Sequence, residues 1–184
     1  FRENNSDTPV ILMGYFNPIY QYGPSRFVTD AVAAGVDGLI MVDLPPEEDE
    51  ELCDPARTAG LHWVRLVTPT SNEGRLKQVL QNTSGFIYYV SIAGITGTRS
   101  AAASAIGEAL ATVRKHTQLP IAVGFGINTA EQVRETGEVA DGAVVGSAII
   151  REIENNLDAS GCAKPELLDR VTGLVSDLAG GLRS

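Results

Sequence analysis

Residues 121–147 restrict the possible folds of this chain more than any other stretch. They contain two short apolar runs, Ile121–Val123 and Ala143–Val145, and each run is closed by a glycine turn. A helical pattern lies between the runs, and a further helix is expected from Ala148. Continuous apolar runs that alternate with helices predict neighbouring parallel strands covered by helices on both faces.

The two glycine turns predict a phosphate site at the carboxyl ends of these strands. Gly124-Phe125-Gly126 follows the first run, and Gly146-Ser147 follows the second. Glycine lets backbone N–H groups approach an anion, and a helix start adds unpaired donors and the positive end of its dipole. In β/α barrels such a site often follows strands seven and eight. The alternative is that both are ordinary tight turns of an α/β protein.

The whole chain repeats this pattern in six strand–helix units. The expected strands are residues 10–15, 38–42, 63–67, 86–90, 121–123 and 143–145, and a long loop of small residues, Ser91–Ser104, follows the fourth. A closed TIM (β/α)8 barrel needs eight units and about 250 residues. We therefore expect residues 1–184 to be a single barrel domain with strands three to eight, the first two β/α units being missing. A complete doubly wound sheet is the alternative, although no dinucleotide fingerprint follows its first strand.

Composition excludes several classes of protein. The formal net charge of −9 argues against a nucleic-acid surface. No apolar run approaches the roughly 20 residues of a membrane helix. Cys53 and Cys162 are far apart, so a reduced, cytoplasmic protein is expected. The acidic run Glu47–Glu51 is most simply explained as the start of a helix, whose dipole it would complement.

Few side chains at the expected strand ends can do chemistry. The three lysines fall on helices or in the tail, so a Schiff-base mechanism lacks its amine. Neither His62 nor His116 has a second ligand nearby in the pattern, so no metal site is predicted. Asp43 is the one carboxylate directly after an expected strand. General acid–base catalysis usually needs more than one titrating group, so Asp43 alone is weak evidence for it. A structural Asp43 that bonds to loop backbone is an equal alternative.

Five segments, taken in order and spacing, resemble the α subunit of tryptophan synthase over essentially the whole chain. They are MGYFNPIYQYG, VDLPPEE, YYVSIAGITGTR, VGFGI and GAVVGSAII. The resemblance implies a β/α-barrel lyase of tryptophan biosynthesis that cleaves indole-3-glycerol phosphate to indole and glyceraldehyde 3-phosphate. It implies no cofactor in this chain, and an α–β heterotetramer in which indole passes to a β subunit that carries pyridoxal phosphate.

The resemblance also assigns roles to individual residues. The substrate-binding residues would be Tyr15, Tyr88, Thr96, Gly97, Phe125, Gly126, Gly146 and Ser147, with Gly97 and the last four of these at the phosphate. Tyr15 would line the indole pocket, and Thr96 would belong to a loop that closes over the site. The partner interface would include Asn17, Pro18, Asp43 and Pro45.

The two catalytic carboxylates of the family, a Glu and an Asp, would both precede residue 1. No catalytic residue is therefore expected in this chain, and Asp43 would support the site. Two other interpretations stay open: another phosphate-binding barrel enzyme, and a docking subunit that activates a partner enzyme.

Overall fold

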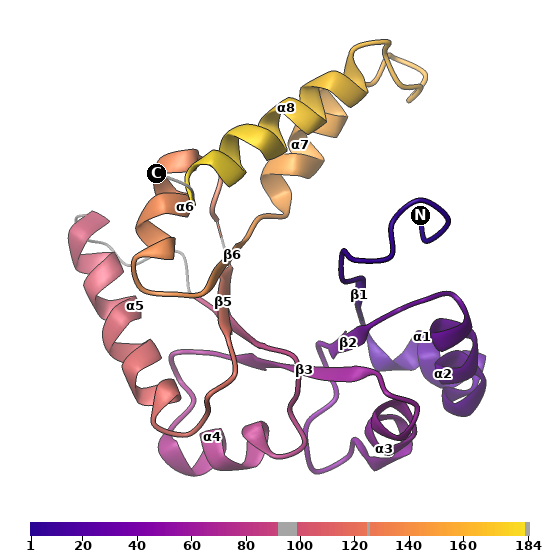
Figure 1. Ribbon diagram of the computed structural model, residues 1–184, viewed down its shortest axis with the longest axis vertical. Helices are drawn as coiled ribbons and strands as arrows, with labels where there is room; N and C mark the ends of the chain where they lie inside the picture. The colour runs from indigo at the N-terminus through magenta and orange to yellow at the C-terminus, as the bar shows by residue number, and fades with distance from the viewer. Residues whose placement is uncertain (92–98, 125, 183–184) are drawn as a thin grey trace. The chain divides into compact units, whose positions relative to one another are not determined.

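The structure, a computed structural model, describes residues 1–91, 99–124 and 126–182 (Figure 1). In these residues six parallel strands alternate with helices, and the strands follow one another in chain order across the sheet. The α/β class and the parallel strands agree with the sequence prediction. The strands are β1 (Ile11–Gly14), β2 (Gly38–Met41), β3 (His62–Val67), β4 (Ile87–Val90), β5 (Ile121–Gly124) and β6 (Gly142–Val144).

The helices lie in the connections between strands and at the carboxyl end of the chain. They are α1 (Phe16–Tyr22), α2 (Pro24–Ala33), α3 (Glu50–Thr58), α4 (Glu73–Leu80), α5 (Arg99–Arg114), α6 (Ala130–Gly137), α7 (Ser147–Asn155) and α8 (Leu167–Gly180). Among the helices that the described residues form, none has the length and apolar character that crossing a membrane requires.

One helix was not predicted, and another begins inside an expected loop. Helix α1 follows β1 directly, and α5 begins at Arg99, inside the expected loop Ser91–Ser104. Residues 92–98 of that loop lie outside the described residues. Helix α1 begins without a side-chain cap of its own, but the Phe16 N–H donates to the Asp43 carboxylate, 27 positions further along the chain. A local pattern could not reveal that partner.

The acidic run is the other correction. Helix α3 begins at Glu50, so only Glu50 and Glu51 lie in its first turn. Asp49 instead pairs with Arg65 of β3, and Glu47 pairs with Arg75 of α4. Two of the five acidic residues therefore join neighbouring elements rather than complementing a helix dipole.

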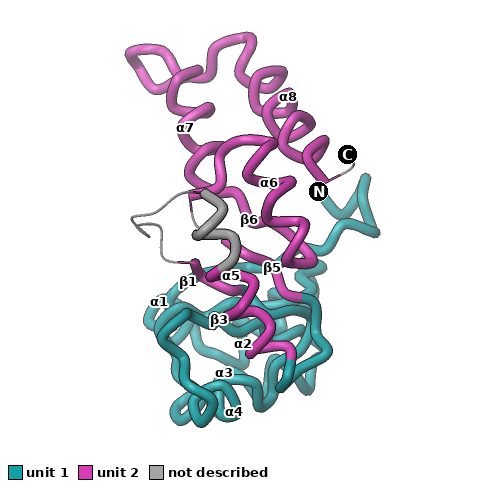
Figure 2. The backbone as a smooth tube through the Cα atoms, turned by 90° about the vertical axis from the view of Figure 1, so that its left-hand side faces the viewer, with its two compact units in different colours: residues 1–88, 115–120 teal, residues 89–114, 121–184 magenta. Residues whose placement is uncertain are grey.

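The chain divides into two compact units, shown in Figure 2: residues 1–88 with 115–120, and residues 89–114 with 121–184. In the first unit every residue of β2 is buried. Leu39 and Met41 of β2 pack with Trp63 and with α2 and α3 in one hydrophobic cluster. Burying a large apolar side chain stabilises a fold by about 1.5–3 kcal/mol, so this cluster is a main source of the unit's stability.

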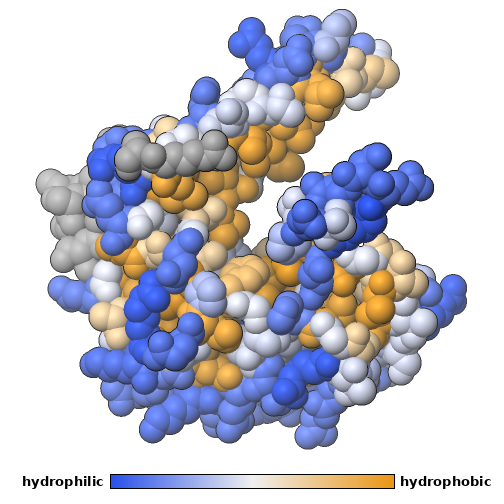
Figure 3. Space-filling view, in the orientation of Figure 1, coloured by the Kyte–Doolittle hydropathy of each residue, from blue (hydrophilic) through white to orange (hydrophobic). Residues whose placement is uncertain are grey.

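The second unit has a hydrophobic cluster of its own. Ile127, Val133 of α6 and Leu178 of α8 are buried together, against Ala143 and other partly buried side chains. Helix α7 contributes no buried residue. Figure 3 shows apolar side chains over α7 and α8, where Ile150, Leu168 and Val175 are exposed. This surface of the second unit is apolar but not packed within it.

In each unit an aspartate joins the amino ends of two neighbouring strands by a pair of hydrogen bonds. Asp37, just before β2, accepts from the Val10 N–H at 2.7 Å and donates its own N–H to the Val10 carbonyl at 2.8 Å. Asp141, just before β6, does the same with Ile121, at 2.8 Å and 2.9 Å. These reciprocal bonds fix the strand register at its start.

Each of these aspartates also has an arginine partner. Arg2 pairs with Asp37, and Arg114 pairs with Asp141 at 2.9 Å. The backbone hydrogen bond and the neighbouring guanidinium hold the pKa of each carboxyl below its usual value. Both aspartates precede a glycine, and at Gly38 an added Cβ would lie 2.9 Å from the His62 carbonyl oxygen, so glycine is needed there.

Replacing Asp141 by Asn should lower the free energy of unfolding by about 1 kcal/mol at neutral pH. A hydrogen bond to a charged group contributes about 1.5–3 kcal/mol, and solvent screening reduces this for a carboxylate that is 43% exposed. Because the folded pKa is lowered, the stabilisation is fully present above the unfolded pKa of about 3.9. It is lost as the pH falls through the folded pKa.

Urea unfolding at several pH values measures this effect. The variant and the original chain should differ at neutral pH and converge in acid. Asp177→Asn, which removes an exposed carboxylate of α8, is the matched control and should change stability by no more than about 0.5 kcal/mol. An equal loss in both variants at neutral pH would contradict the role of Asp141.

Candidate functional site

The strand register brings the two predicted phosphate turns to the same level of the sheet edge. Gly124 of β5 is paired with Val144 of β6. Gly126 and Gly146 each follow two residues later, at equivalent positions beyond the carboxyl ends. Both are exposed, and Gly126 has a φ of 75°, which favours glycine.

The second turn opens directly into a helix. Gly146 is the N-cap of α7, and its carbonyl accepts from the Ile149 N–H at 2.9 Å. The first N–H groups of a helix have no acceptor within it, and no side chain caps those of α7. Its first turn carries no acidic residue, and a Cβ at Gly146 would meet no atom within 4 Å. Open space therefore adjoins a helix start whose dipole favours an anion.

Three of the other residues assigned to substrate lie outside the described residues: Thr96, Gly97 and Phe125. Tyr88 belongs to β4, and burial raises the pKa of its phenol. It is therefore neutral at physiological pH and can act only as a hydrogen-bonding or packing group. Tyr15 precedes α1 and is 60% exposed. The substrate roles of both tyrosines stay predictions.

The first unit brings together the residues assigned to the partner interface. Gly14 of β1 is paired with Met41 of β2, so Phe16 and Asp43 lie at equivalent positions beyond the strand ends. The Phe16 N–H donates to Asp43 Oδ1 at 2.8 Å. Asp43 thus has the structural role that the sequence left open. It ties the start of α1, with exposed Asn17 and Pro18, to the loop after β2 that contains Pro45.

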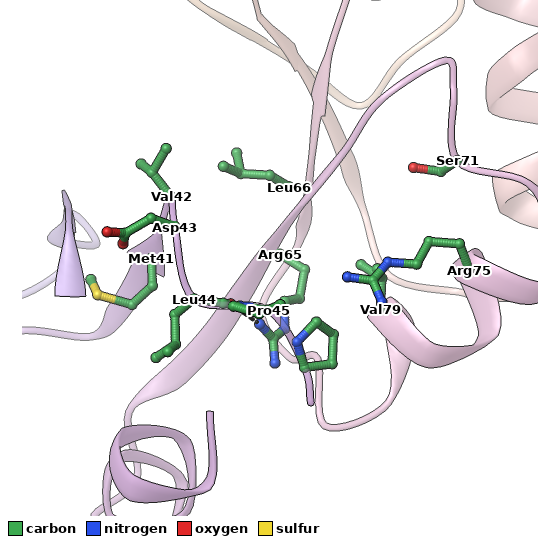
Figure 4. A pocket seen from close by; sticks show the side chains of 11 residues that line it. Met41, Val42, Asp43, Leu44, Pro45, Arg65, Leu66, Ser71, Arg75 and Val79 are labelled. Carbon is green, nitrogen blue, oxygen red and sulfur yellow. Dashed lines mark hydrogen bonds between the residues drawn. The ribbon is translucent and has the colours of Figure 1, made fainter. Parts of the chain in front are cut away.

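Sequence reasoning missed a cavity beside this loop. It has a volume of about 400 Å³, and its walls include Asp43, Pro45, Arg65 and Arg75 (Figure 4). Arg65 lies in the middle of β3 and is 5% exposed. Burial lowers the pKa of its guanidinium to about 10, so the group stays charged at neutral pH. An arginine inside an otherwise apolar strand was the signal that could have revealed it.

The described residues do not form a metal site, and one of the two free cysteines lies in the core. They contain no group of three or more His, Cys, Asp or Glu side chains that could hold a metal ion. Cys53 is buried in α3, and burial raises the pKa of its thiol to about 11. A protonated, enclosed thiol is a poor nucleophile, so Cys53 is a core residue.

Comparison with known proteins identifies the family. The family model described as "Tryptophan synthase alpha chain" matches residues 1–174. The chain belongs to the tryptophan synthase alpha chain family. The resemblance of the five sequence segments is thereby confirmed.

Solved structures of this family agree with the fold. Tryptophan synthase subunit alpha from Legionella pneumophila is 37% identical, with a TM-score of 0.86, over 100% of this chain and 66% of that chain. A chain of the tryptophan synthase α2β2 complex from Pyrococcus furiosus is 36% identical, with a TM-score of 0.83, over 97% and 69% of the respective chains. Tryptophan synthase from M. tuberculosis is 29% identical, with a TM-score of 0.80.

The sequence spans about two thirds of these tryptophan synthase alpha chains, and 66% of the Legionella chain. The six parallel strands correspond to part of the barrel of that family. The predicted fold class, a barrel represented by six of its β/α units, is confirmed.

Replacing Gly146 by Ala should weaken the binding of glycerol 3-phosphate about tenfold. The added methyl group would occupy the open space before α7, and an anion would lose at least one charge-assisted hydrogen bond of about 1.5–3 kcal/mol. The φ of Gly146 is −125°, so the substitution needs no left-handed backbone.

Isothermal calorimetry with glycerol 3-phosphate measures the change. Gly173→Ala in α8 is the control, because a Cβ there also meets no atom within 4 Å. Its affinity should equal that of the original chain. Unchanged affinity in the Gly146 variant would show that the anion does not bind before α7.

Proposed function

We propose that this chain provides the phosphate anchor and the partner-docking surface of an indole-3-glycerol phosphate lyase. The reaction would be the retro-aldol cleavage that releases indole and glyceraldehyde 3-phosphate. The observation that carries the proposal is that Gly126 and Gly146 each lie two residues beyond the paired residues Gly124 and Val144, with α7 starting directly after the second glycine. Family membership supports the choice of substrate.

The cleavage breaks the bond between the indole ring and the glycerol carbon. An acid must protonate the ring carbon, and a base must take the proton of the neighbouring hydroxyl, which becomes the aldehyde oxygen. A phosphate held before α7 would fix one end of the substrate, so that binding energy remote from the reacting bond orients it. Backbone amides suit this task because they stay in place and do not titrate.

The proposed partner is a tryptophan synthase β subunit. The homologue from Pyrococcus furiosus belongs to a tryptophan synthase α2β2 complex, and its structure is described as the basis of mutual activation in that complex. In this chain the exposed residues Asn17 and Pro18 are joined to the loop after β2 by the bond between Phe16 and Asp43. These residues of the first unit, Asn17, Pro18 and the loop after β2 with Pro45, are the docking face that we propose. A docking subunit that activates a partner enzyme is the second candidate function, and this linkage is the observation that favours it.

Replacing Asn17 by Arg should weaken the binding of a β subunit at least tenfold. A long charged side chain at an exposed position on the docking face would have to be desolvated or displaced on binding. Ser25→Arg is the matched control, since Ser25 is also the exposed second residue of its helix, α2. Calorimetry with a purified β subunit measures both. Equal affinity of the two variants would move the interface away from α1.

The 184-residue polypeptide by itself should not release indole from indole-3-glycerol phosphate. Among the described residues, Asp43 is the one carboxylate within two residues of a strand's carboxyl end, and it already accepts from the Phe16 N–H. A general acid or base contributes about 100- to 10,000-fold to rate, so one supporting carboxylate leaves the reaction near its background rate.

An assay for indole with and without the chain tests this expectation. Binding of glycerol 3-phosphate in the same preparation serves as the control for folded protein. Turnover well above background would show that Asp43, or another group of this chain, transfers the protons.

A further inference from the structure

Arg65 joins the two ends of one short segment of the docking face. Its Nη1 donates to the Leu44 carbonyl at 3.0 Å, and its Nη2 pairs with Asp49 Oδ2. Leu44 and Asp49 are the first and last residues of the segment Leu44–Asp49, which leads from the end of β2 to the start of α3. Figure 4 shows the side chain of Arg65 beside Leu44 and Pro45.

This connection is almost fully buried. The side chains of Arg65 and Asp49 are 6% and 3% exposed, and the Leu44 side chain is buried as well. The guanidinium also lies 5.3 Å from the ring centroid of Trp63, which is 1% exposed. The planar guanidinium of arginine is a rigid fork of N–H donors that can reach a carbonyl and a carboxylate at once. Lysine could not replace it, because its ammonium offers only a point charge. The fork is thus anchored on the core of the first unit.

A buried ion pair is a poor way to gain stability alone. Apolar residues of similar volume are often as stable or more so, because desolvating two charges offsets their attraction. What an apolar pair cannot do is hold a chosen backbone carbonyl at a fixed place. Between its ends the segment contains Pro45 and Pro46, which lack N–H donors. The Glu48 N–H donates to the Pro45 carbonyl at 3.0 Å, but this bond lies within the segment and does not join it to a neighbouring element.

We propose that Arg65 is a positioning residue that holds the segment Leu44–Asp49 in the conformation that meets the partner β subunit. The inference rests on the proposed docking function and names the interaction that shapes one half of its surface. The Phe16–Asp43 hydrogen bond fixes the neighbouring half. The exposed Arg75–Glu47 pair reaches the same segment from α4, but exposed pairs contribute little.

The test compares the original chain with Arg65→Met/Asp49→Ala, which removes both charges together. We expect the urea concentration at its unfolding midpoint to be close to that of the original chain. Amide exchange of the peptide that contains Leu44, Glu47 and Glu48 should become at least about tenfold faster, because the segment has lost its fixed ends. Affinity for a purified β subunit should fall about tenfold, since binding must then order the segment.

Two further variants make the test specific. Arg65→Lys keeps the charge beside Asp49 but loses the fork, so we expect faster exchange of the same peptide even if the double variant fails to fold. Arg75→Met removes the exposed pair on the same segment and should change its exchange less than about twofold. Glycerol 3-phosphate binding should be unchanged in all three variants, since the anion site belongs to the second unit.

Exchange as slow in Arg65→Lys and in the folded double variant as in the original chain would overturn the positioning role. An equal increase of amide exchange in Arg75→Met would overturn it too, because the exposed ion pair would then hold the segment as well as Arg65 does. If the original chain binds no β subunit, the docking function fails, whereas the exchange measurement still decides whether Arg65 fixes the segment. Faster exchange with undiminished affinity would overturn the link between the segment and docking.

Discussion

The register of the parallel strands is the constraint on which both candidate sites depend. In the first unit Asp37, before β2, exchanges two hydrogen bonds with Val10, before β1. In the second unit Asp141, before β6, exchanges two with Ile121, the first residue of β5. The same register then decides what meets beyond the carboxyl ends. In one unit it brings the Phe16 N–H to the Asp43 carboxylate. In the other it pairs Gly124 with Val144, and Gly126 and Gly146 each follow two residues later. A slip of one residue would exchange the two faces of a strand and separate these groups.

The sequence predicted the features that are local and periodic. Short apolar runs identified the strands, and the glycine turns after β5 and β6 predicted the phosphate anchor that we propose. Helix α1, the course of the acidic run and the Arg65 fork were missed for one physical reason. Each depends on a partner far along the chain: Asp43 for Phe16, and Arg65 or Arg75 for the acidic run. No periodicity reports such pairs, although a charged residue within a buried strand does indicate that a partner must exist.

The two charged connections to the loop after β2 differ in kind. Glu47 and Arg75 are both exposed, so water screens their attraction and their separation costs little. Asp49 and Arg65 are enclosed, and removing either alone would leave a buried charge without compensation, at a cost of about 3–5 kcal/mol. A buried pair of this kind restricts the loop to one arrangement, since any alternative would have to break it. That restriction suits a surface that another protein must recognise.

Anchoring and chemistry are separable in this chain. Backbone amides before α7 can hold a phosphate without any group that titrates, whereas cleavage needs an acid and a base at the other end of the substrate. Interactions that bind substrate and transition state equally well raise affinity but not the rate of the chemical step. The anchor becomes catalytically useful only when proton-transfer groups are placed against the bond that it orients. Without them, the residues of this chain would account for the proposed recognition of substrate and partner, and not for the rate.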